Sequence, residues 1–168
     1  MTEEIKRLSQ LIKQSQHIVF FGGAGVSTES QIPDFRSDDG LYGDKQAKRY
    51  PYPPETMLSH SFFEQHTKEF FEYYFDKMVY PDAKPNPAHI ALAKLEQMGK
   101  LSAVITQNID GLHQMAGSRR VCELHGSVHR NFCMNCGKKY NLSQFDFSHN
   151  YLYFWDIFEK SNLFLENI

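Results

Sequence analysis

The sequence predicts an α/β fold built on a parallel β-sheet with helices on both faces. Three apolar runs have the length of buried strands, at residues 17–21, 101–106 and 121–124. A helical pattern at residues 87–99, which Gly99 closes, lies directly before the second run. Because strands that alternate with helices form parallel sheets through right-handed crossovers, we expect the three runs to pair side by side.

Two further helical regions flank a long loop region. Residues 2–15 place apolar side chains on one helical face, and Thr2 and Glu4 suit its first turn. Residues 22–53 are rich in Gly and Pro and predict loops, whereas helical periodicity returns at about 54–79. That second stretch carries an aromatic stripe of Phe62, Phe63, Phe70, Phe71, Tyr74 and Phe75. Such a stripe is more typical of core packing than of a ligand site.

Composition is that of an ordinary globular protein and disfavours several partners. The 168 residues are 41% hydrophobic and 23% charged, and a net charge of -2 gives no electrostatic reason to expect nucleic acid. The polar N-terminus lacks the pattern of a signal peptide, and no apolar run reaches transmembrane length. We therefore expect a cytoplasmic protein that binds no membrane. Three cysteines, an odd number, argue against a disulfide framework.

A glycine-rich turn follows the first strand and is the most informative feature of the chain. The segment Gly22-Gly23-Ala24-Gly25 lets backbone amides approach a phosphate closely. Residues 33–36, with the sequence PDFR, then stop any long helix and predict a polar, aromatic loop. A dehydrogenase-type site is disfavoured, because Thr28 replaces the third glycine of that motif and Asp44 lies in a loop instead of at a strand end. The turn therefore indicates chemistry on a bound nucleotide.

Polar residues also follow the second strand, at the sheet edge where open α/β sheets bind ligands. Gln107, Asn108 and Asp110 offer donors and acceptors that suit a ribose or a carboxamide. A strand-to-helix turn in which Asp110 only caps the helix is an equally good interpretation of this segment alone.

Histidines supply the candidate acid–base groups. His125 follows the third strand and can act as a general base, because imidazoles exchange protons near neutral pH. A lone histidine is more often structural, but its place at the same sheet edge favours a role in the site. His89 is expected to pack in its helix, and His113 either to line the site or to cap locally; His129 is a weaker candidate.

The segment Cys133-Met134-Asn135-Cys136 predicts a structural zinc site rather than a redox motif. Its surroundings suit a knuckle between hairpin strands, whereas a thioredoxin-like pair would lie at a strand-to-helix junction. Zinc takes four ligands, and no cysteine follows Cys136. Cys122 lies within the third strand and is expected to pack there.

Together these motifs resemble the sirtuins, NAD-dependent protein-lysine deacetylases and deacylases, in their bacterial type. The resemblance runs from about Ser9 to Tyr140 and rests on GAGVSTESQIPDFRS, PNPAHIAL, TQNIDGLH, ELHGSV and CMNCG. It implies a partial Rossmann-like sheet with a small helical and zinc-knuckle insertion. Gly22 stands where the family commonly has Thr, and Gln31 where it commonly has Gly.

The resemblance also implies roles for the site residues. Residues 23–25 would meet the NAD pyrophosphate, residues 34–36 would form a mobile loop over the nicotinamide, and His125 would be the general base. The cofactor-binding set would be Gly23, Ala24, Gly25, Ser27, Asp34, Phe35, Arg36, Gln107, Asn108, Ile109 and Asp110. Cys133 and Cys136 would be half of a four-cysteine zinc site. The acyl oxygen of an acyl-lysine protein or peptide would attack the ribose, and nicotinamide would leave. His125 would help to deprotonate a ribose hydroxyl that attacks the acyl carbon, and water would then release free lysine and O-acyl-ADP-ribose.

The end of the chain departs from the family. Residues 1–140 are expected to form the N-terminal part of the catalytic domain, with the first half of the zinc knuckle at 128–140. Residues 141–168 are an aromatic-rich tail without Gly, Pro or Cys that matches none of the expected C-terminal half. Our hypothesis is a truncation or frameshift soon after Tyr140, which would remove the adenosine-binding strands and leave little or no deacylase activity.

Three functions therefore remain open for the chain itself. The first is the deacylase, which should prefer neutral acyl groups such as acetyl, because the chain has no arginine between Arg49 and Arg119 to pair with a succinyl carboxylate. The second is an inactive fragment that binds NAD or ADP-ribose. The third is a zinc-knuckle interaction module.

Overall fold

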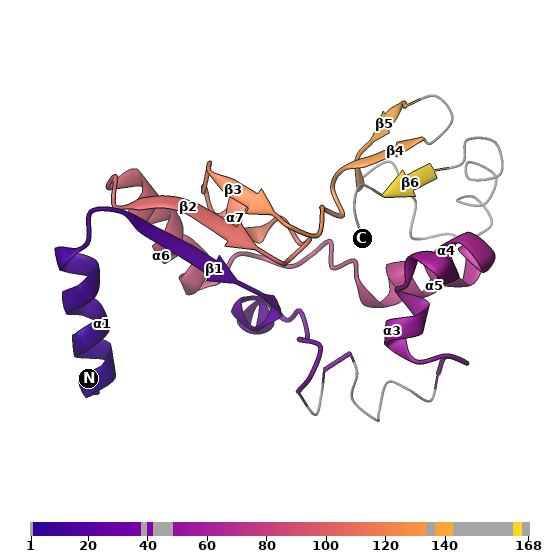
Figure 1. Ribbon diagram of the computed structural model, residues 1–168, viewed down its shortest axis with the longest axis horizontal. Coiled ribbons are helices and arrows are strands. Elements are labelled where there is room, and N and C mark those ends of the chain that lie inside the picture. Colours follow the sequence, from indigo (N-terminus) through magenta and orange to yellow (C-terminus); the bar gives the residue numbers. More distant parts are fainter. Residues whose placement is uncertain (1, 38–39, 42–48, 134–136, 143–162, 166–168) are drawn as a thin grey trace.

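The computed structural model describes residues 2–37, 40–41, 49–133, 137–142 and 163–165. Figure 1 shows a twisted sheet with its helices on the left, and a helical region and a small second sheet on the right. No helix in these ranges is long and apolar enough to cross a membrane.

A three-stranded parallel sheet confirms the predicted α/β core (Figure 1). Its strands are β1 (Ile18–Gly22), β2 (Leu101–Thr106) and β3 (Val121–Glu123), in that spatial order. Gly22 pairs with Thr106 and Thr106 pairs with Glu123, so the three strands end at one edge. That edge is where an open α/β sheet binds its ligands.

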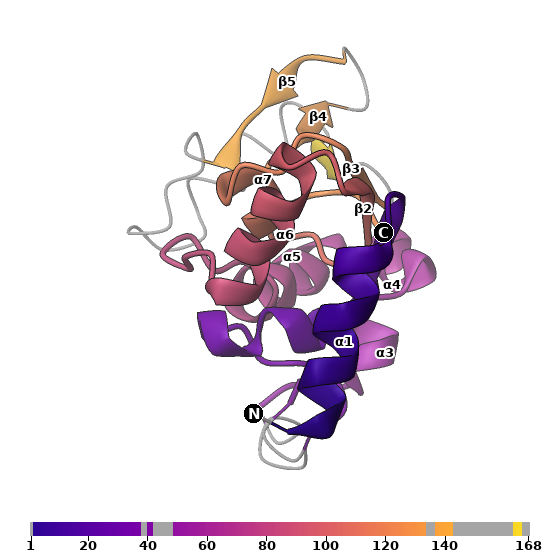
Figure 2. The ribbon, with the colours of Figure 1, turned by 90° about the vertical axis from the view of Figure 1, so that its left-hand side faces the viewer.

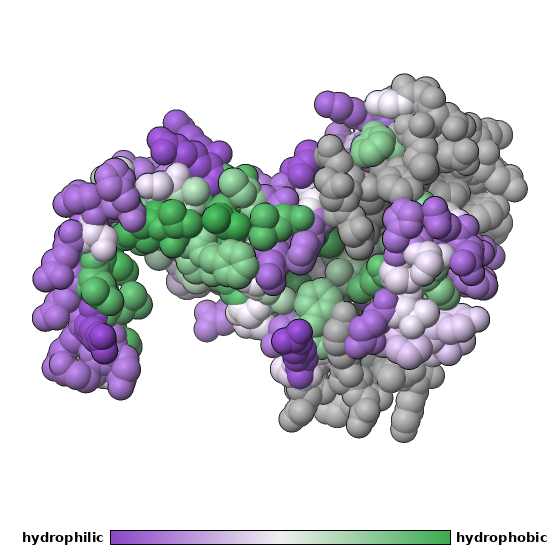
Figure 3. Space-filling view, viewed as in Figure 1, coloured by the Kyte–Doolittle hydropathy of each residue, from purple (hydrophilic) through white to green (hydrophobic). Residues whose placement is uncertain are grey.

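Helices α6 (Pro87–Gln97) and α7 (Leu112–Met115) lie on one face of this sheet (Figure 2). Val104 and Thr106 of β2 are buried beneath them. In the part of the chain that the structure describes, the other face stays open, and Val19 and Phe21 are 57% and 61% exposed. Figure 3 shows apolar side chains gathered over this sheet. The prediction that Cys122 packs inside its strand is wrong: Cys122 is exposed, because the register places it on the same open face as Phe21.

Helix α1 (Glu3–Gln14) precedes β1 and is fastened at both ends. The Thr2 hydroxyl accepts a hydrogen bond from the amide of Ile5 at 3.4 Å, as the sequence predicts. At the other end, the Lys100 ammonium donates to the carbonyls of Ile12, Lys13 and Ser15 at 2.9–3.1 Å. A cation at this position also interacts favourably with the helix dipole.

The region predicted as one helical stretch over 54–79 forms three helices: α3 (Pro54–Met57), α4 (His60–Gln65) and α5 (Thr67–Lys77). Ser59 interrupts the pattern because its hydroxyl accepts from the amide of Phe62 and caps α4. His66 then leaves the helical conformation, with φ −135° and ψ 48°, between α4 and α5. Local side-chain capping thus overrides the continuous periodicity.

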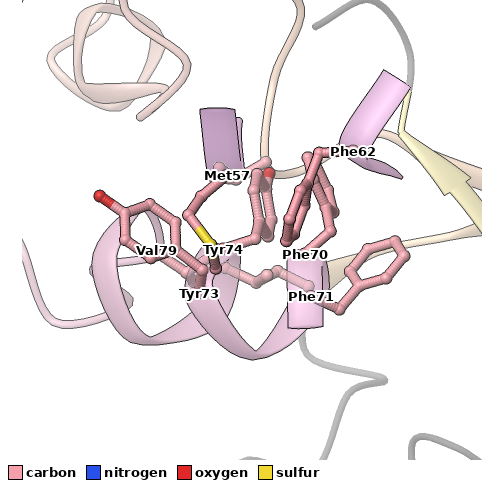
Figure 4. Packing of buried hydrophobic residues seen from close by; sticks show 9 residues of the cluster. Met57, Phe62, Phe70, Phe71, Tyr73, Tyr74 and Val79 are labelled. Atoms are coloured by element: carbon pink, nitrogen blue, oxygen red, sulfur yellow. The ribbon is translucent and has the colours of Figure 1, made fainter. Parts of the chain in front are cut away.

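The aromatic stripe forms the main hydrophobic core, as predicted (Figure 4). Phe70 is 3% exposed and contacts the rings of Phe63, Phe71 and Tyr74 at centroid distances of 5.1–6.0 Å. The buried members of this cluster are Met57, Phe62, Phe70, Phe71, Tyr73, Tyr74, Val79, Val128 and Leu142. Because Val128 and Leu142 lie before β4 and after β5, the cluster joins the helical region to the second sheet.

That second sheet contains β4 (Asn131–Cys133), β5 (Lys139–Tyr140) and β6 (Leu163–Leu165) in the order β5-β4-β6. Strands β4 and β5 pair antiparallel, with Asn131 opposite Tyr140. The predicted hairpin around the C-x-x-C segment is therefore present. Cys136 lies outside the described residues, as do most of residues 141–168.

The Gln31→Gly substitution is expected to raise the free energy of unfolding by about 0.5–1 kcal/mol. Gln31 has φ 66° and ψ 21°, a left-handed conformation that costs side chains with a Cβ more than glycine. Urea denaturation measures the change. The matched Gln10→Gly substitution, in the interior of α1, should lower stability by about 1 kcal/mol. A loss of stability for Gln31→Gly would contradict this prediction.

Candidate active site

A cleft of about 640 Å³ lies at the carboxyl edge of the parallel sheet. It brings together segments that follow all three strands: Ala24 after β1, Gln107 after β2 and His125 after β3. The residues of the predicted site that line it are Ala24, Ser27, Asp34, Phe35, Arg36, Gln107, Asn108, Ile109, Asp110 and His125. Gly23 and Gly25 do not line the cleft directly.

The glycine turn winds into two short 3-10 turns, η1 (Ala24–Val26) and η2 (Thr28–Ser30). A Cβ atom at Gly23 would lie 3.1 Å from Oε1 of Gln107, so a side chain at this position would push on a cleft residue. A Cβ atom at Gly25, which is exposed and outside the cleft, would meet no atom within 4 Å. The amide of Gln107 donates to the carbonyl of Gly22 at 3.0 Å, which keeps the first strand end close to the second.

Ser27 lies at the centre of a hydrogen-bonded cluster formed with Asn108 and Asp110. Ser27 is fully buried, and its hydroxyl donates to Oδ2 of Asp110 at 2.7 Å. The Asn108 side-chain amide donates to the Ser27 hydroxyl at 3.0 Å. Because the two partners come from the loop after β2, this cluster ties that loop to the glycine turn.

Asp110 lines the cleft and also bonds to the start of α7, whereas binding of a ribose or carboxamide stays a prediction. While Oδ2 accepts from Ser27, Oδ1 accepts from the amide of Leu112, the first residue of α7, at 2.9 Å. The carbonyl of Asp110 lies 3.0 Å from Nε2 of His129. A Cβ atom at the next residue, Gly111, would come within 2.7 Å of the His129 ring, and the φ of Gly111 is 72°. This close approach requires glycine there.

The loop of residues 33–36 is organised around Asp34. Its Oδ1 atom accepts from the amides of Arg36 at 3.2 Å and Ser37 at 2.8 Å, and its carbonyl accepts from Leu41. Hydrogen bonds from the side chain and backbone of Ser37 hold the pKa of Asp34 below its ordinary value. Asp34 therefore carries a negative charge at neutral pH and shapes the loop that borders the cleft.

His125 occupies the turn directly after β3 and is exposed at the cleft. Nearby, Glu123 at the end of β3 is almost fully buried and forms an ion pair with Arg130. This pair fixes the strand end from which His125 projects. An exposed imidazole at the cleft can exchange protons with a bound ligand and with solvent.

His89 and His113 lie beneath the cleft and do not line it. They are 0% and 1% exposed, and their ring centroids are 4.7 Å apart. Burial lowers the pKa of His89, and burial together with the neighbouring His89 lowers the pKa of His113 to about 4. His89 packs as predicted, whereas His113 packs against Phe20 instead of lining the site.

The sequence did not identify the apolar side of the cleft, which includes Leu58, Met78 and Tyr80. Leu58 follows α3, and Met78 and Tyr80 follow α5. Burial raises the pKa of Tyr80, and the nearby Asp76 adds to this effect. These residues belong to the aromatic helical region, whose periodicity indicates only that it packs. The sequence carried no local signal that its end reaches the cleft.

The predicted zinc ligands fall largely outside the described residues. Cys133 ends β4, while Cys136 lies in the undescribed segment before β5. Among the residues that the structure describes, no group of three or more His, Cys, Asp or Glu is arranged to hold a metal ion. Two cysteines supply only half of a tetrahedral zinc site, so zinc binding stays a prediction.

Comparison with known proteins identifies the family. The model of the Sir2 family matches residues 23–152, a range that extends beyond the predicted boundary at residue 140. NAD-dependent protein deacetylases of Clostridium acetobutylicum and Clostridium tetani are 61% and 64% identical over 142 and 138 residues. These alignments cover 84% and 82% of this chain and 57% and 55% of the two relatives.

Solved structures give the same result. A Sir2 structure described with a deacetylated p53 peptide and 3'-O-acetyl ADP-ribose has a TM-score of 0.72 and 43% identity, over 83% of this chain and 54% of that one. The chain thus spans little more than half the length of these relatives. Since the family model matches more than half of the chain, and the sheet and motifs agree with it, this chain belongs to the Sir2 family.

Proposed function

We propose that the cleft serves NAD-dependent removal of acyl groups from protein lysines. The main support is that Ser27, Asn108 and Asp110 form one hydrogen-bonded cluster at the cleft into which His125 projects. The named relatives are NAD-dependent protein deacetylases, and a solved relative is described with a peptide and an acetylated ADP-ribose. Cleft and relatives therefore favour the same chemistry.

The residues present fit the nicotinamide-ribose half of NAD. NAD, when bound, supplies a ribose carbon whose bond to nicotinamide breaks as the acyl oxygen attacks. Asn108 and Asp110 offer polar groups beside the cleft, and Ser27 holds both side chains in place. His125 would accept the proton of a ribose hydroxyl. The loop around Asp34 would help to exclude water.

The apolar side of the cleft suits a neutral acyl group. Leu58, Met78 and Ile109 line it, and Arg36 is the one arginine among the lining residues that the structure describes. The sequence has no arginine between Arg49 and Arg119, so the helical region that supplies Leu58 and Met78 carries none to pair with a succinyl carboxylate. Acetyl-lysine should therefore be preferred over succinyl-lysine.

A second candidate function is binding of NAD or ADP-ribose without turnover. The observation that favours it is the hydrogen-bonded cluster of Ser27, Asn108 and Asp110 at the cleft, which suits ligand binding whether or not turnover follows. Turnover requires all reacting groups to be held in one precise arrangement. Ligand binding requires only some of these contacts, and the described cleft supplies polar groups for them.

The experiment compares ADP-ribose binding with nicotinamide release, using the purified chain and acetyl- and succinyl-lysine peptides. The Asp110→Ala variant is expected to weaken ADP-ribose binding by about 10–100-fold, because it removes an acceptor at the cleft and leaves the buried Ser27 hydroxyl without an acceptor for its proton. The His125→Ala variant should leave binding within about threefold while lowering any NAD-dependent acyl transfer by at least about 100-fold.

Asp82→Ala, an exposed carboxylate away from the cleft, is the control and should change neither quantity. Binding without nicotinamide release would favour the second candidate. Absence of ADP-ribose binding at millimolar concentration would contradict both, and equal turnover of the two peptides would contradict the acetyl preference.

We also propose that Cys133 and Cys136 contribute two ligands to a structural zinc ion. Support comes from β4 and β5, which pair antiparallel and carry the C-x-x-C segment between them. Hairpin turns of this kind are typical of zinc ribbons. The remaining ligands would come from elsewhere, and no step of the reaction depends on this ion.

A further inference from the structure

The PNPAHIAL segment has no part in the site described above, yet one of its residues contacts the glycine turn from behind. Asn86 precedes α6, is 6% exposed and does not line the cleft. Its side-chain amide nitrogen donates to the carbonyl of Val26 at 2.7 Å and lies 3.0 Å from the hydroxyl of Ser30. Asn86 thus bonds to both 3-10 turns of the glycine segment.

All hydrogen-bonding groups of the Asn86 side chain are in use. Oδ1 accepts from the amide of Ala88 at 2.9 Å and caps α6, while the two N–H groups meet Val26 and Ser30. The backbone amide of Asn86 donates to Nδ1 of the buried His89. This capping box fixes the orientation of the Asn86 side chain. An amide is needed here, because only it combines one acceptor with two donors.

The two contacts of Asn86 bracket Ser27. Val26 precedes Ser27 directly, and the amide of Ser30 donates to the Ser27 carbonyl at 2.9 Å. The Ser27 side chain then bonds to Asn108 and Asp110. A continuous chain of hydrogen bonds therefore leads from the start of α6 through the glycine turn to the loop after β2.

We propose that Asn86 is a positioning residue that clamps the glycine turn against α6 and thereby holds Ser27, Asn108 and Asp110 in the arrangement that binds the ADP-ribose part of NAD. The proposal rests on the proposed function for its ligand, but the clamp can be observed without any ligand. The simpler alternative is that Asn86 acts only as the cap of α6.

The Asn86→Asp variant separates the two roles. Aspartate caps helices about as well as asparagine, so α6 keeps its cap. The new carboxylate, however, has no N–H to donate and places a negative oxygen against the Val26 carbonyl. Asn86→Asp should therefore release the glycine turn without unfolding α6. Ser59→Asp, which changes the cap of α4 while retaining a capping oxygen, is the matched control.

The experiment measures amide hydrogen exchange by NMR and ADP-ribose affinity by calorimetry on the full chain. In Asn86→Asp, the amides of Ser27, Ser30 and Gln31 should exchange at least tenfold faster, while amides of β2 change less than threefold. The ADP-ribose dissociation constant should rise about tenfold. Ser59→Asp should change neither. Ser30→Ala should have a smaller effect, because it removes one of the two contacts of Asn86 and leaves the hydrogen bond to Val26 in place.

Each outcome decides the proposal. Unchanged exchange in the glycine turn would show that Asn86 is only a cap and would overturn the clamp. Faster exchange with unchanged ADP-ribose affinity would overturn the role in positioning the binding site. If the parent chain binds no ADP-ribose, the proposed function fails and the positioning role fails with it, whereas the exchange data still show whether the clamp exists.

Discussion

Replacement of Phe70 by Ala is expected to lower the free energy of unfolding by about 3–5 kcal/mol. Phe70 is 3% exposed and contacts three other aromatic rings, so its removal opens a cavity that fixed helices cannot close. A domain of this size is stable by about 5–15 kcal/mol in total, so the loss is a large part of the whole. Urea denaturation followed by circular dichroism gives the change.

Phe21→Ala is the matched control for this substitution. Phe21 is also aromatic but is 61% exposed on the open face of the sheet. Its removal should lower the free energy of unfolding by less than about 1 kcal/mol. A similar loss for both variants would mean that the helical region around Phe70 does not form the core. Because this region also supplies Leu58, Met78 and Tyr80 to the cleft, Phe70→Ala should weaken the apolar side of the site as well.

Acidification is expected to destabilise the chain through His113, by about 3 kcal/mol between pH 7 and pH 4. Burial, together with the neighbouring His89, lowers the pKa of His113 from 6.5 to about 4, although Asp110 and Glu123 oppose the shift. The unfolded chain therefore binds the proton near pH 6.5, but the folded chain resists it until about pH 4. Stability is thus greatest above pH 6.5 and falls as the pH drops through this window.

The measurement is urea denaturation at several pH values between 7 and 4, for the parent chain and for His113→Gln. As the pH falls, the free energy of unfolding of the variant should decrease less steeply than that of the parent chain, because glutamine does not titrate. His60→Gln provides the control, since the His60 side chain is 64% exposed. An equal pH dependence of the free energy of unfolding in the parent chain and in His113→Gln would contradict the role of His113. The shift of His89 in the same direction should leave some acid sensitivity in the variant.

Much of the fold follows from patterns that are local in sequence. Apolar runs and glycines predicted all three strands of the parallel sheet within a residue or two, because strand length and chain breaks depend on neighbouring residues. The helical stretch over 54–79 was less well predicted. There the capping hydroxyl of Ser59 and the non-helical backbone of His66 divide a region whose periodicity alone looks continuous.

The candidate site also contains some residues that local sequence patterns predict and others that they do not. Asn108, Asp110 and His125 could be predicted because each directly follows a strand, and parallel strands end at one edge of a sheet. Cys122 was predicted to be buried because apolar strands usually are, but whether a face is covered depends on neighbours that strand patterns do not specify.

By itself, the sequence determined the parallel sheet, the glycine turn and the polar residues at the strand ends, since these depend on local spacing and residue chemistry. The tertiary structure alone decided which distant side chains complete the site. Asn86 contacts Val26 across 60 residues, and Ser27 meets Asp110 across 83. The physical reason is that such hydrogen bonds depend on how packed helices and strands lie in space, which no periodicity along the chain records.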